Sequence, residues 1–242
     1  MRVGFFVTCL VDLVRPAIGF AAIKLLKSGG ADVYVPPAQT CCGQPAYNSG
    51  DRVDAIALAR KVVEEFEGCD YLVAPSGSCS GMIKTHYADL FEGDAAMKRR
   101  VMALGAKTYE LTDFLVSVLK VKATAGRYKG KITYHDSCAG LREMGVKTQP
   151  RVLLAGMAGV ELIEMADCET CCGFGGTFSI KYGDISARLA DNKCVHVQNS
   201  GADALVLGDL GCMMNIEGRL RRRGDAKTRV LHIAEVLASE GD

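Results

Sequence analysis

Cys41-Cys42-Gly43 in the first half of the chain recurs as Cys171-Cys172-Gly173 in the second half, 130 residues later. One cysteine before each pair and one after it complete a wider frame, namely Cys9 and Cys79 in the first half and Cys138 and Cys212 in the second. The leading cysteines stand 32 and 33 residues before the pairs, and the trailing ones stand 37 and 40 residues after them. Cysteine is scarce, so this repetition indicates an internal duplication. Each half gathers four thiols, and gathered thiolates bind soft metals or carry out redox chemistry.

The bulk composition describes an ordinary globular protein. The 242 residues are 49% apolar and 24% charged, which supplies enough apolar material for a core, and the repeat favours two fused halves. The formal net charge of +1 gives no general attraction to nucleic acid or to an anionic membrane, so we expect no nucleic-acid partner. The basic cluster at residues 219–223 is typical of the C-terminal end of a helix, where cations are favoured.

The start of the chain and its hydropathy predict a cytoplasmic protein without direct membrane insertion. The first apolar run is too short for the hydrophobic region of a signal peptide, and no stretch approaches the ~18 apolar residues that span a bilayer. Thiols stay reduced in the cytoplasm. The eleven cysteines therefore predict metal binding or redox chemistry rather than disulfide bridges.

Short apolar runs alternate with helical patterns in both halves, which predicts parallel βαβ units. We expect strands at residues 3–8, 32–35, 71–74, 131–134, 161–165 and 204–208. We expect helices at residues 16–28, 51–66, 151–158 and 179–198, with further helices that begin near Cys79 and Cys212. The predicted fold class is α/β, with two tandem Rossmann-like repeats whose parallel sheets are related by a pseudo-twofold axis. The lysine- and glycine-bearing stretch at 120–130 is the expected linker, which gives domains of residues 1–125 and 126–242.

Every cysteine of the frame falls just after an expected strand, at its carboxyl end. Ligands bind at that edge of an open parallel sheet because strand-to-helix loops and helix N-termini converge there. Helix N-termini also favour the thiolate over the thiol. We therefore expect two meeting points, one formed by Cys9, Cys41, Cys42 and Cys79 and the other by Cys138, Cys171, Cys172 and Cys212.

Four thiolates at one point suit either tetrahedral zinc or an iron–sulfur cluster. Structural zinc usually takes two close CxxC-type pairs, whereas the close pair here consists of two adjacent cysteines. Adjacent thiolates can reach different irons of one cluster, so the pattern favours iron and sulfide, with zinc as the alternative. The glycines that follow the pairs, Gly43 and Gly173, are consistent with a tight turn and with close approach of the backbone to the cofactor.

These motifs resemble the cysteine-rich CCG domain, and two copies cover nearly the whole chain. The domain occurs in one subunit each of heterodisulfide reductase, glycolate oxidase and anaerobic glycerol-3-phosphate dehydrogenase. Within this family, the chain is most similar to the stand-alone CCG subunit of a three-protein L-lactate oxidation system. The segments that carry the similarity are Thr40-Cys-Cys-Gly-Gln-Pro45, Pro75-Ser-Gly-Ser-Cys-Ser-Gly-Met82, His135-Asp-Ser-Cys138 and Cys171-Cys-Gly-Phe-Gly-Gly-Thr-Phe178.

The resemblance implies an iron–sulfur redox subunit that is active within a complex. Its expected reaction is the oxidation of L-lactate, or of a related small 2-hydroxy acid, to pyruvate or the matching oxo acid. Electrons would pass to partner iron–sulfur subunits. No flavin or nicotinamide motif is visible, so the chain alone has no evident hydride acceptor.

The chain departs from the family pattern at one position in each half. The family motif commonly ends in CxxC, but Ser76 and Asp209 stand where its first cysteine would be. The five-cysteine clusters of heterodisulfide reductase therefore do not transfer to these four-cysteine sites. Three arrangements stay open: one or two 4Fe–4S clusters on four thiolates, a cluster with an oxygen ligand from Ser76 or Asp209, and a site without metal.

His135 is the candidate catalytic residue. It lies three residues before Cys138 at the end of an expected strand, where the first half has Phe6. We predict that it acts as an acid–base group or binds a substrate carboxylate. Cys168 forms a Cys168-x-x-Cys171 pair, which is a redox dithiol, a source of a fifth ligand or a spare thiol.

Two functions of other classes remain open on the sequence alone. One is a thiol–disulfide reductase subunit, in which the cysteines themselves are the reaction centre for a small disulfide. The other is a zinc-binding assembly module without catalysis. Activity toward disulfides would select the first, and colourless protein with stoichiometric zinc would select the second.

Overall fold

The computed structural model describes residues 1–240 and contains two parallel sheets of four strands each. The strands of the first sheet are β1 (Arg2–Phe5), β2 (Asp32–Tyr34), β3 (Tyr71–Ala74) and β4 (Thr108–Glu110). Those of the second are β5 (Gly130–His135), β6 (Val160–Leu162), β7 (Ala204–Leu207) and β8 (Arg229–His232). The central strands are buried because helices cover both faces of a parallel sheet, and the edge strands β2 and β6 are partly exposed.

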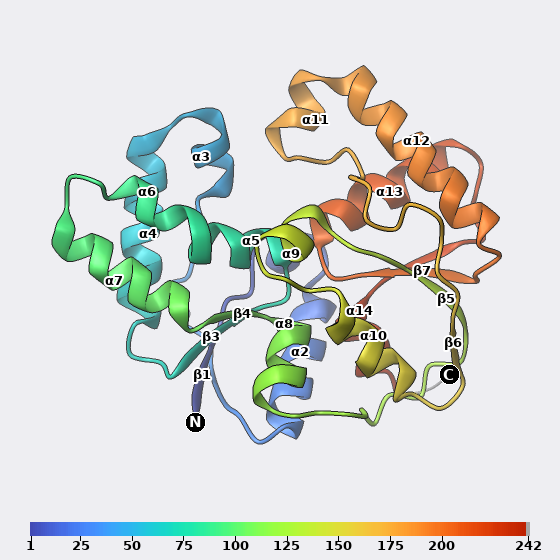
Figure 1. The fold of residues 1–242 in the computed structure, drawn as a ribbon, viewed down its shortest axis with the longest axis horizontal. Coiled ribbons are helices and arrows are strands. Elements are labelled where there is room, and N and C mark those ends of the chain that lie inside the picture. The colour runs from blue at the N-terminus through green and yellow to red at the C-terminus, as the bar shows by residue number, and fades with distance from the viewer. Residues whose placement is uncertain (241–242) are drawn as a thin grey trace.

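The second half repeats the topology of the first. The strand order is β2-β1-β3-β4 in one sheet and β6-β5-β7-β8 in the other. Figure 1 shows the first half, in blue to green, beside the second half, in yellow to red. The α/β fold class with two tandem repeats is thereby confirmed.

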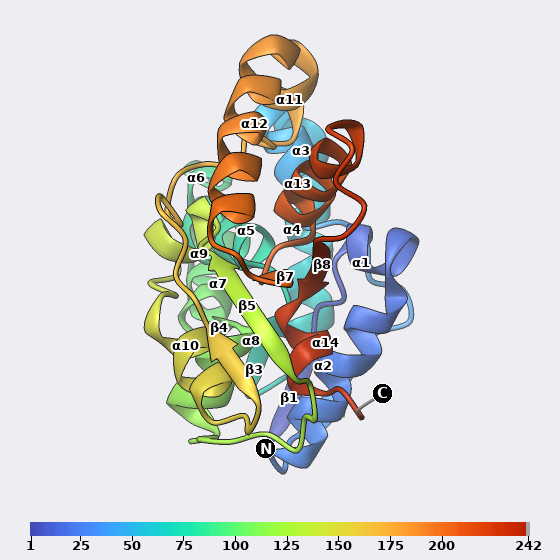
Figure 2. The same ribbon diagram turned by 90° about the vertical axis from the view of Figure 1, so that its right-hand side faces the viewer.

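Helices connect the strands and flank the sheets, as Figure 2 shows from the side of the second half. The first half contains α1 (Cys9–Val14), α2 (Pro16–Ser28), α3 (Gln44–Ser49), α4 (Arg52–Phe66), α5 (Gly77–Gly81), α6 (Tyr87–Leu90), α7 (Ala95–Ala106) and α8 (Leu111–Asp113), with the π-helical turns η1 (Met82–His86) and η2 (Phe114–Val118). The second half contains α9 (Cys138–Arg142), α10 (Thr148–Ala155), α11 (Thr177–Lys181), α12 (Gly183–Asn199), α13 (Leu210–Arg222) and α14 (Ile233–Leu237). No helix of the described chain has both the length and the apolar character needed to cross a bilayer.

Most expected elements are present, but several details are corrected. The strands expected over 3–8 and 161–165 end earlier, at Phe5 and Leu162. The sequence did not indicate β4 and β8, because each has only three or four residues and includes polar ones. The single helix expected over 179–198 is instead two helices, since Tyr182 has non-helical backbone angles just before Gly183. The helix expected to begin at Arg151 begins at Thr148.

One hydrophobic core joins the two halves. It combines buried side chains of β1, α2 and η2 with side chains of β7 and α14, for example Phe5, Leu26, Phe114, Leu205 and Leu237. A second core cluster belongs to the first half alone and surrounds α4, η1 and α7. The two repeats therefore share buried surface rather than standing as separate globules.

The helices α5 and α9, one from each half, pack side by side near the centre of the molecule (Figure 1). Their backbones approach so closely that a Cβ atom on Gly77 would lie 2.6 Å from the Cα atom of Gly140. Both helices carry a cysteine of the frame. This contact therefore places the two cysteine sets next to each other.

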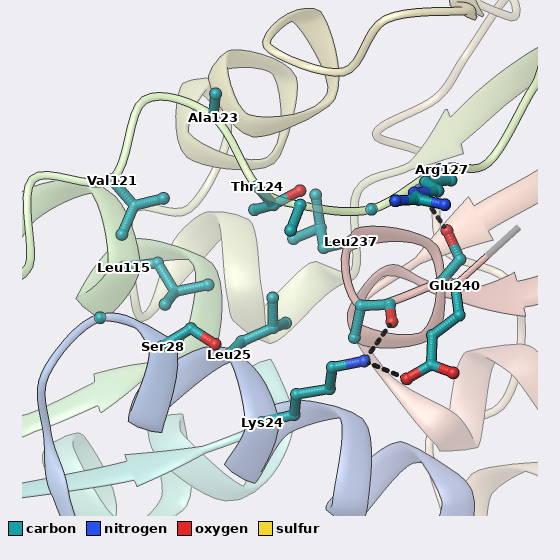
Figure 3. A pocket seen from close by; sticks show the side chains of 15 residues that line it. Lys24, Leu25, Ser28, Leu115, Val121, Ala123, Thr124, Arg127, Leu237 and Glu240 are labelled. Carbon is teal, nitrogen blue, oxygen red and sulfur yellow. Dashed lines mark hydrogen bonds and ion pairs between the residues drawn. The ribbon is translucent and has the colours of Figure 1, made fainter.

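The segment that links the halves runs between η2 and β5 and covers one end of their interface. A cavity of about 630 Å³ lies at this place. Figure 3 shows side chains that line it, among them Lys24, Leu115, Thr124 and Leu237. The Lys24 ammonium group lies 2.6 Å from the Glu240 carboxylate. None of the lining residues is a cysteine of the frame, so this cavity is separate from the sites described below. The domain boundary between residues 125 and 126 stays a prediction.

Candidate metal centres

All eight cysteines of the frame line two cavities. The first cysteine cavity, of about 150 Å³, is lined by Cys9, Cys41, Cys42 and Cys79. The second cysteine cavity, of about 190 Å³, is lined by Cys138, Cys171, Cys172 and Cys212. The structure thus brings together the same two sets of four that the sequence placed together. That they ligate a metal stays a prediction.

Helix starts position the leading cysteine of each set. The chain leaves β1 and turns sharply at Thr8, which has φ 60° and whose side chain accepts a hydrogen bond from the Val11 N–H at 3.3 Å. In the second half, the Ser137 hydroxyl accepts a hydrogen bond from the Gly140 N–H at 3.3 Å. Such capping fixes the first turn of a helix. The thiols of Cys9 and Cys138 therefore occupy equivalent, well-defined places.

The glycines after the cysteine pairs shape the turn that presents the sulfur atoms. Gly43 and Gly173 have φ values of 84° and 89°, which other residues rarely adopt. Their N–H groups donate to the sulfurs of Cys41 and Cys171 at 3.4 and 3.3 Å. A Cβ atom on Gly173 would also lie 2.6 Å from the carbonyl oxygen of Ser186. Both positions therefore require glycine, and their predicted contact with a cofactor is untested.

The sulfur atoms of each set interact with one another. The sulfurs of Cys9 and Cys41 are 3.7 Å apart. Hydrogen bonds from the thiols of Cys42, the larger cause, and of Cys9 hold the pKa of Cys41 well below its usual range. In the second set, hydrogen bonds from the thiols of Cys138, the larger cause, and of Cys172 lower the pKa of Cys171 in the same way. Each set therefore has one thiol that ionises readily, and the thiolate is the form that binds metal.

The donor atoms fit a sulfur-ligated metal or an iron–sulfur cluster. Each cavity offers four thiols from segments far apart in sequence, together with one backbone N–H directed at a sulfur. Hydrogen bonds to sulfur stabilise cluster thiolates and tune their potential. Clustered thiols of this kind suggest metal binding.

The two positions that depart from the CxxC pattern contact each other across the halves. The Ser76 hydroxyl and the Ser78 N–H both donate to Oδ2 of Asp209 at 3.0 Å. The other carboxylate oxygen, Oδ1, accepts from the Gly211 N–H at 3.1 Å. Ser76 and Asp209 are buried, and they cap the equivalent helices α5 and α13. Both side chains are therefore already engaged in hydrogen bonds that join the two halves.

The two cysteine cavities are neighbours. They share the lining residues Gln44, Asn48, Ser78, Phe174, Gly176 and Asp209. Gln44 and Phe174 directly follow Gly43 and Gly173. The Gln44 amide donates to the Ser78 carbonyl oxygen at 3.4 Å, and the Phe174 ring packs against Gly211. Each side chain therefore contacts the first turn of the helix that bears a trailing cysteine. No local pattern indicated this shared wall, because it depends on how the halves pack.

His135 is fully buried next to the second cysteine cavity but is not among its lining residues. Its Nδ1 lies 3.1 Å from the carbonyl oxygen of Cys168, and its Nε2 has no hydrogen-bond partner among the described residues. A ring nitrogen of His135 lies within 4.8 Å of the sulfurs of Cys172 and Cys212. Burial and the nearby Lys193 ammonium group lower the pKa of His135 to about 3. Its acid–base or carboxylate-binding role stays a prediction.

Lys193 is a second buried basic group near these thiols, and sequence reasoning missed it. The side chain is 1% exposed, and its ammonium group donates to the Asp167 carbonyl oxygen. Burial lowers the pKa of Lys193. The sequence could have indicated this buried lysine, because it stands on the apolar face of α12, one residue before the buried Cys194. Phe6 occupies the first-half position that corresponds to His135, so the residues behind the two cavities differ in polarity.

Cys168 lines neither cysteine cavity. Its thiol is 4.0 Å from a guanidinium nitrogen of Arg151, which binds the buried Asp136 carboxylate through two contacts of 2.9 Å. Burial raises the pKa of Cys168. Its backbone carbonyl, rather than its sulfur, contacts the histidine beside the second cysteine cavity.

Comparison with known proteins agrees with this architecture. Residues 3–84 and 132–217 each match the cysteine-rich CCG domain, so the chain belongs to the CCG family and carries two copies of the domain. It is 46% identical over 239 residues to lactate utilization protein A of Geobacillus sp. (strain WCH70), covering 99% of this chain and 100% of that protein. It is 47% identical over 237 residues to lactate utilization protein A of Geobacillus kaustophilus (strain HTA426), covering 98% of each.

Among solved structures, a hypothetical protein from Helicobacter pylori aligns with a TM-score of 0.70 at 10% sequence identity. The alignment covers 100% of this chain and 49% of that one. At this identity the similarity concerns the fold alone. The chain accordingly spans about half the length of that protein.

Proposed function

We propose that the chain is an iron–sulfur redox subunit that works within a complex to oxidise L-lactate, or a related 2-hydroxy acid, to the oxo acid. The observation that carries the proposal is the gathering of four thiols at each of two neighbouring cavities. The substrate class comes from relatives named lactate utilization protein A, which match the chain over nearly their full length.

The reaction sets requirements that a single chain does not meet. Oxidation of a 2-hydroxy acid to a 2-oxo acid releases two electrons and two protons, so electron acceptors are needed. Iron–sulfur clusters, when bound, supply one-electron carriers. The residues of this chain would hold the sulfurs in place and surround them with buried apolar groups. Partner iron–sulfur subunits would receive the electrons, and we place the complex in the cytoplasm.

A growth experiment tests this function directly. Deletion of the gene should abolish growth on L-lactate, and the wild-type gene should restore it. Variants Cys79→Ala and Cys212→Ala, each lacking one cavity-lining thiol, should fail to restore growth. Cys69→Ala is the matched control, because Cys69 is buried within the core of the first half and lines neither cysteine cavity. Undiminished growth of the deletion strain on L-lactate would contradict the proposal.

One observation favours thiol–disulfide chemistry as the second candidate. The contact of 3.7 Å between the sulfurs of Cys9 and Cys41, with the lowered pKa of Cys41, is an arrangement from which a disulfide could form. A purified complex that reduces a small disulfide but leaves 2-hydroxy acids unchanged would select this candidate. Oxidation of L-lactate with no disulfide reduction would exclude it.

A further inference from the structure

We propose that Nε2 of His135 is a nitrogen ligand of the metal at the second cysteine cavity. That site then has a mixed nitrogen and sulfur ligand set, whereas the first has sulfur donors alone. The inference rests on the proposed iron–sulfur function and adds a ligand to one of its sites. It does not depend on which substrate the complex oxidises.

The position of the nitrogen suits a metal ligand. A ring nitrogen of His135, Sγ of Cys172 and Sγ of Cys212 all lie within 4.8 Å of one another, and all three side chains are buried. A buried polar atom normally has a hydrogen-bond partner, and one without a partner requires an explanation. Nε2 of His135 has none among the described residues. A metal bound to the same two sulfurs would satisfy it.

The orientation of the ring also favours ligation through Nε2. Nδ1 of His135 faces the carbonyl oxygen of Cys168 at 3.1 Å, and the Asp136 N–H donates to the same oxygen at 3.1 Å. A carbonyl oxygen only accepts hydrogen bonds, so Nδ1 carries the proton and the neutral ring keeps the lone pair of Nε2 free for a metal. Metal-ligating histidines commonly donate their other N–H to a backbone carbonyl, which fixes the ring.

Each half lacks one cysteine of the CxxC pattern, and in the second half His135 could supply a donor atom in its place. Asp209 stands where the CxxC pattern has a cysteine, and its carboxylate is occupied by Ser76, Ser78 and Gly211. His135 supplies a donor atom next to two sulfurs of the same cavity. The corresponding residue of the first half is Phe6, which has no donor atom. The two sites therefore differ in the donor atoms that they offer to a metal.

The neutral charge of the imidazole has a consequence for electron transfer. Both cavities keep four thiols, so the imidazole adds a donor without a change in thiolate charge, and the ligand set tunes the potential of iron–sulfur centres. The two sites should therefore differ in midpoint potential. Electrons would collect at the site of higher potential before they leave the subunit.

Nitrogen ligation can be measured on the wild-type protein, without any variant. The chain is produced with ¹⁵N-labelled histidine, purified anaerobically and brought to a paramagnetic state of its clusters. Pulsed electron paramagnetic resonance should detect a strongly coupled nitrogen whose signal changes from the ¹⁴N to the ¹⁵N pattern on labelling. Cys212→Ala should remove the signal, and Cys79→Ala, its counterpart in the first half, should keep it.

A pair of histidine variants gives a second readout. His135→Phe copies the first-half residue and should abolish the nitrogen coupling and shift the midpoint potential of one cluster only. His86→Gln is the control, because His86 is partly exposed and contacts Glu143 at 3.5 Å, outside the second cysteine cavity. It should change neither the coupling nor the potential.

The outcomes separate the inference from the proposed function. Protein with iron and sulfide but without a strongly coupled histidine nitrogen overturns the ligand assignment and leaves the iron–sulfur function intact. Protein without iron, after anaerobic purification, overturns both. A histidine coupling that survives in His135→Phe would assign the nitrogen to another residue and contradict the proposal.

Discussion

Asp209 illustrates how a single residue can change the role of a motif. A cysteine at this position would add a fifth sulfur to the second cysteine cavity. The carboxylate instead accepts hydrogen bonds from Ser76, Ser78 and Gly211, and so connects the first turns of α5 and α13. The position at which the CxxC pattern has a cysteine therefore joins the two halves here.

Removal of this carboxylate should destabilise the protein. In Asp209→Ala, the buried Ser76 hydroxyl and the N–H groups of Ser78 and Gly211 lose their acceptor. Each unsatisfied buried group costs about 1–3 kcal/mol, so the free energy of unfolding should fall by at least that amount. Urea unfolding measures it, with Asp12→Ala as the control at an exposed position. Equal stability of both variants would show that the contact contributes nothing.

Glu110 should make stability depend on pH. Burial raises the pKa of its carboxyl group from 4.5 to about 7. Between these values the unfolded chain releases a proton that the folded chain retains, so stability falls as pH rises. The loss amounts to about 3 kcal/mol, at about 1.4 kcal/mol for each pH unit. Glu110→Gln should remove it, as urea unfolding at pH 5 and pH 8 would show.

Buried histidines act in the opposite direction, so the experiment has to compare the two proteins. Burial lowers the pKa of His232 from 6.5 to about 4. Because of this group, the free energy of unfolding falls as the pH drops below 6.5. His232 is present in both the wild type and Glu110→Gln, and the difference between them isolates the carboxyl group. Parallel pH profiles for the two proteins would contradict the prediction.

At the scale of elements, the packing of α5 against α9 leaves no room for a side chain at residue 77. A Cβ atom at residue 77 would lie 2.6 Å from Cα and 2.7 Å from N of Gly140, and backbone atoms cannot rotate away. Gly77→Ala should therefore destabilise the fold by about 1–3 kcal/mol, as overpacking does. It should also reduce metal binding at both cavities, because Cys79 and Cys138 lie on the displaced helices. Metal analysis and urea unfolding measure the two effects.

Gly93→Ala is the matched control for that substitution. A Cβ atom at Gly93 would meet nothing within 4 Å, and its φ is not in the left-handed region. The variant should keep wild-type stability and metal content. If Gly77→Ala behaved in the same way, the close approach of the two helices would be wrong.

The elements that sequence reasoning predicted are those with strong local signals. The strand at Tyr71–Ala74 and the helix at Pro16–Ser28 agree in both bounds, since an apolar run marks one and a proline and two glycines mark the other. The cysteine sets were also predictable, because strand ends in a parallel sheet converge whatever the details. The strands β4 and β8 were not, because their three or four residues carry too little pattern.

The remaining features of the site depend on packing between the halves. No local signal could place Ser76 against Asp209 across 133 positions of sequence, or bring Gln44 and Phe174 to a shared wall. The orientation of the His135 ring depends on the carbonyl of Cys168, 33 residues away. The sequence could predict that thiols gather, but not which polar groups surround them.

At the scale of the whole molecule, the shared core predicts cooperative unfolding. One continuous cluster of buried side chains combines elements of both halves, so neither half can bury its apolar surface alone. The wild-type chain should unfold in a single transition by circular dichroism and by fluorescence. Separate chains of residues 1–125 and 126–242 should not fold on their own. Two distinct transitions, or stable fragments, would show that the halves are independent domains.

The central claim is that the two cysteine cavities are iron–sulfur sites. The most direct test is to purify the chain anaerobically and to measure iron, acid-labile sulfide and zinc, with absorption spectra before and after dithionite. We predict brown protein with about four irons and four sulfides for each occupied site, which bleaches on reduction. Colourless protein with free thiols, or with stoichiometric zinc, would contradict the account.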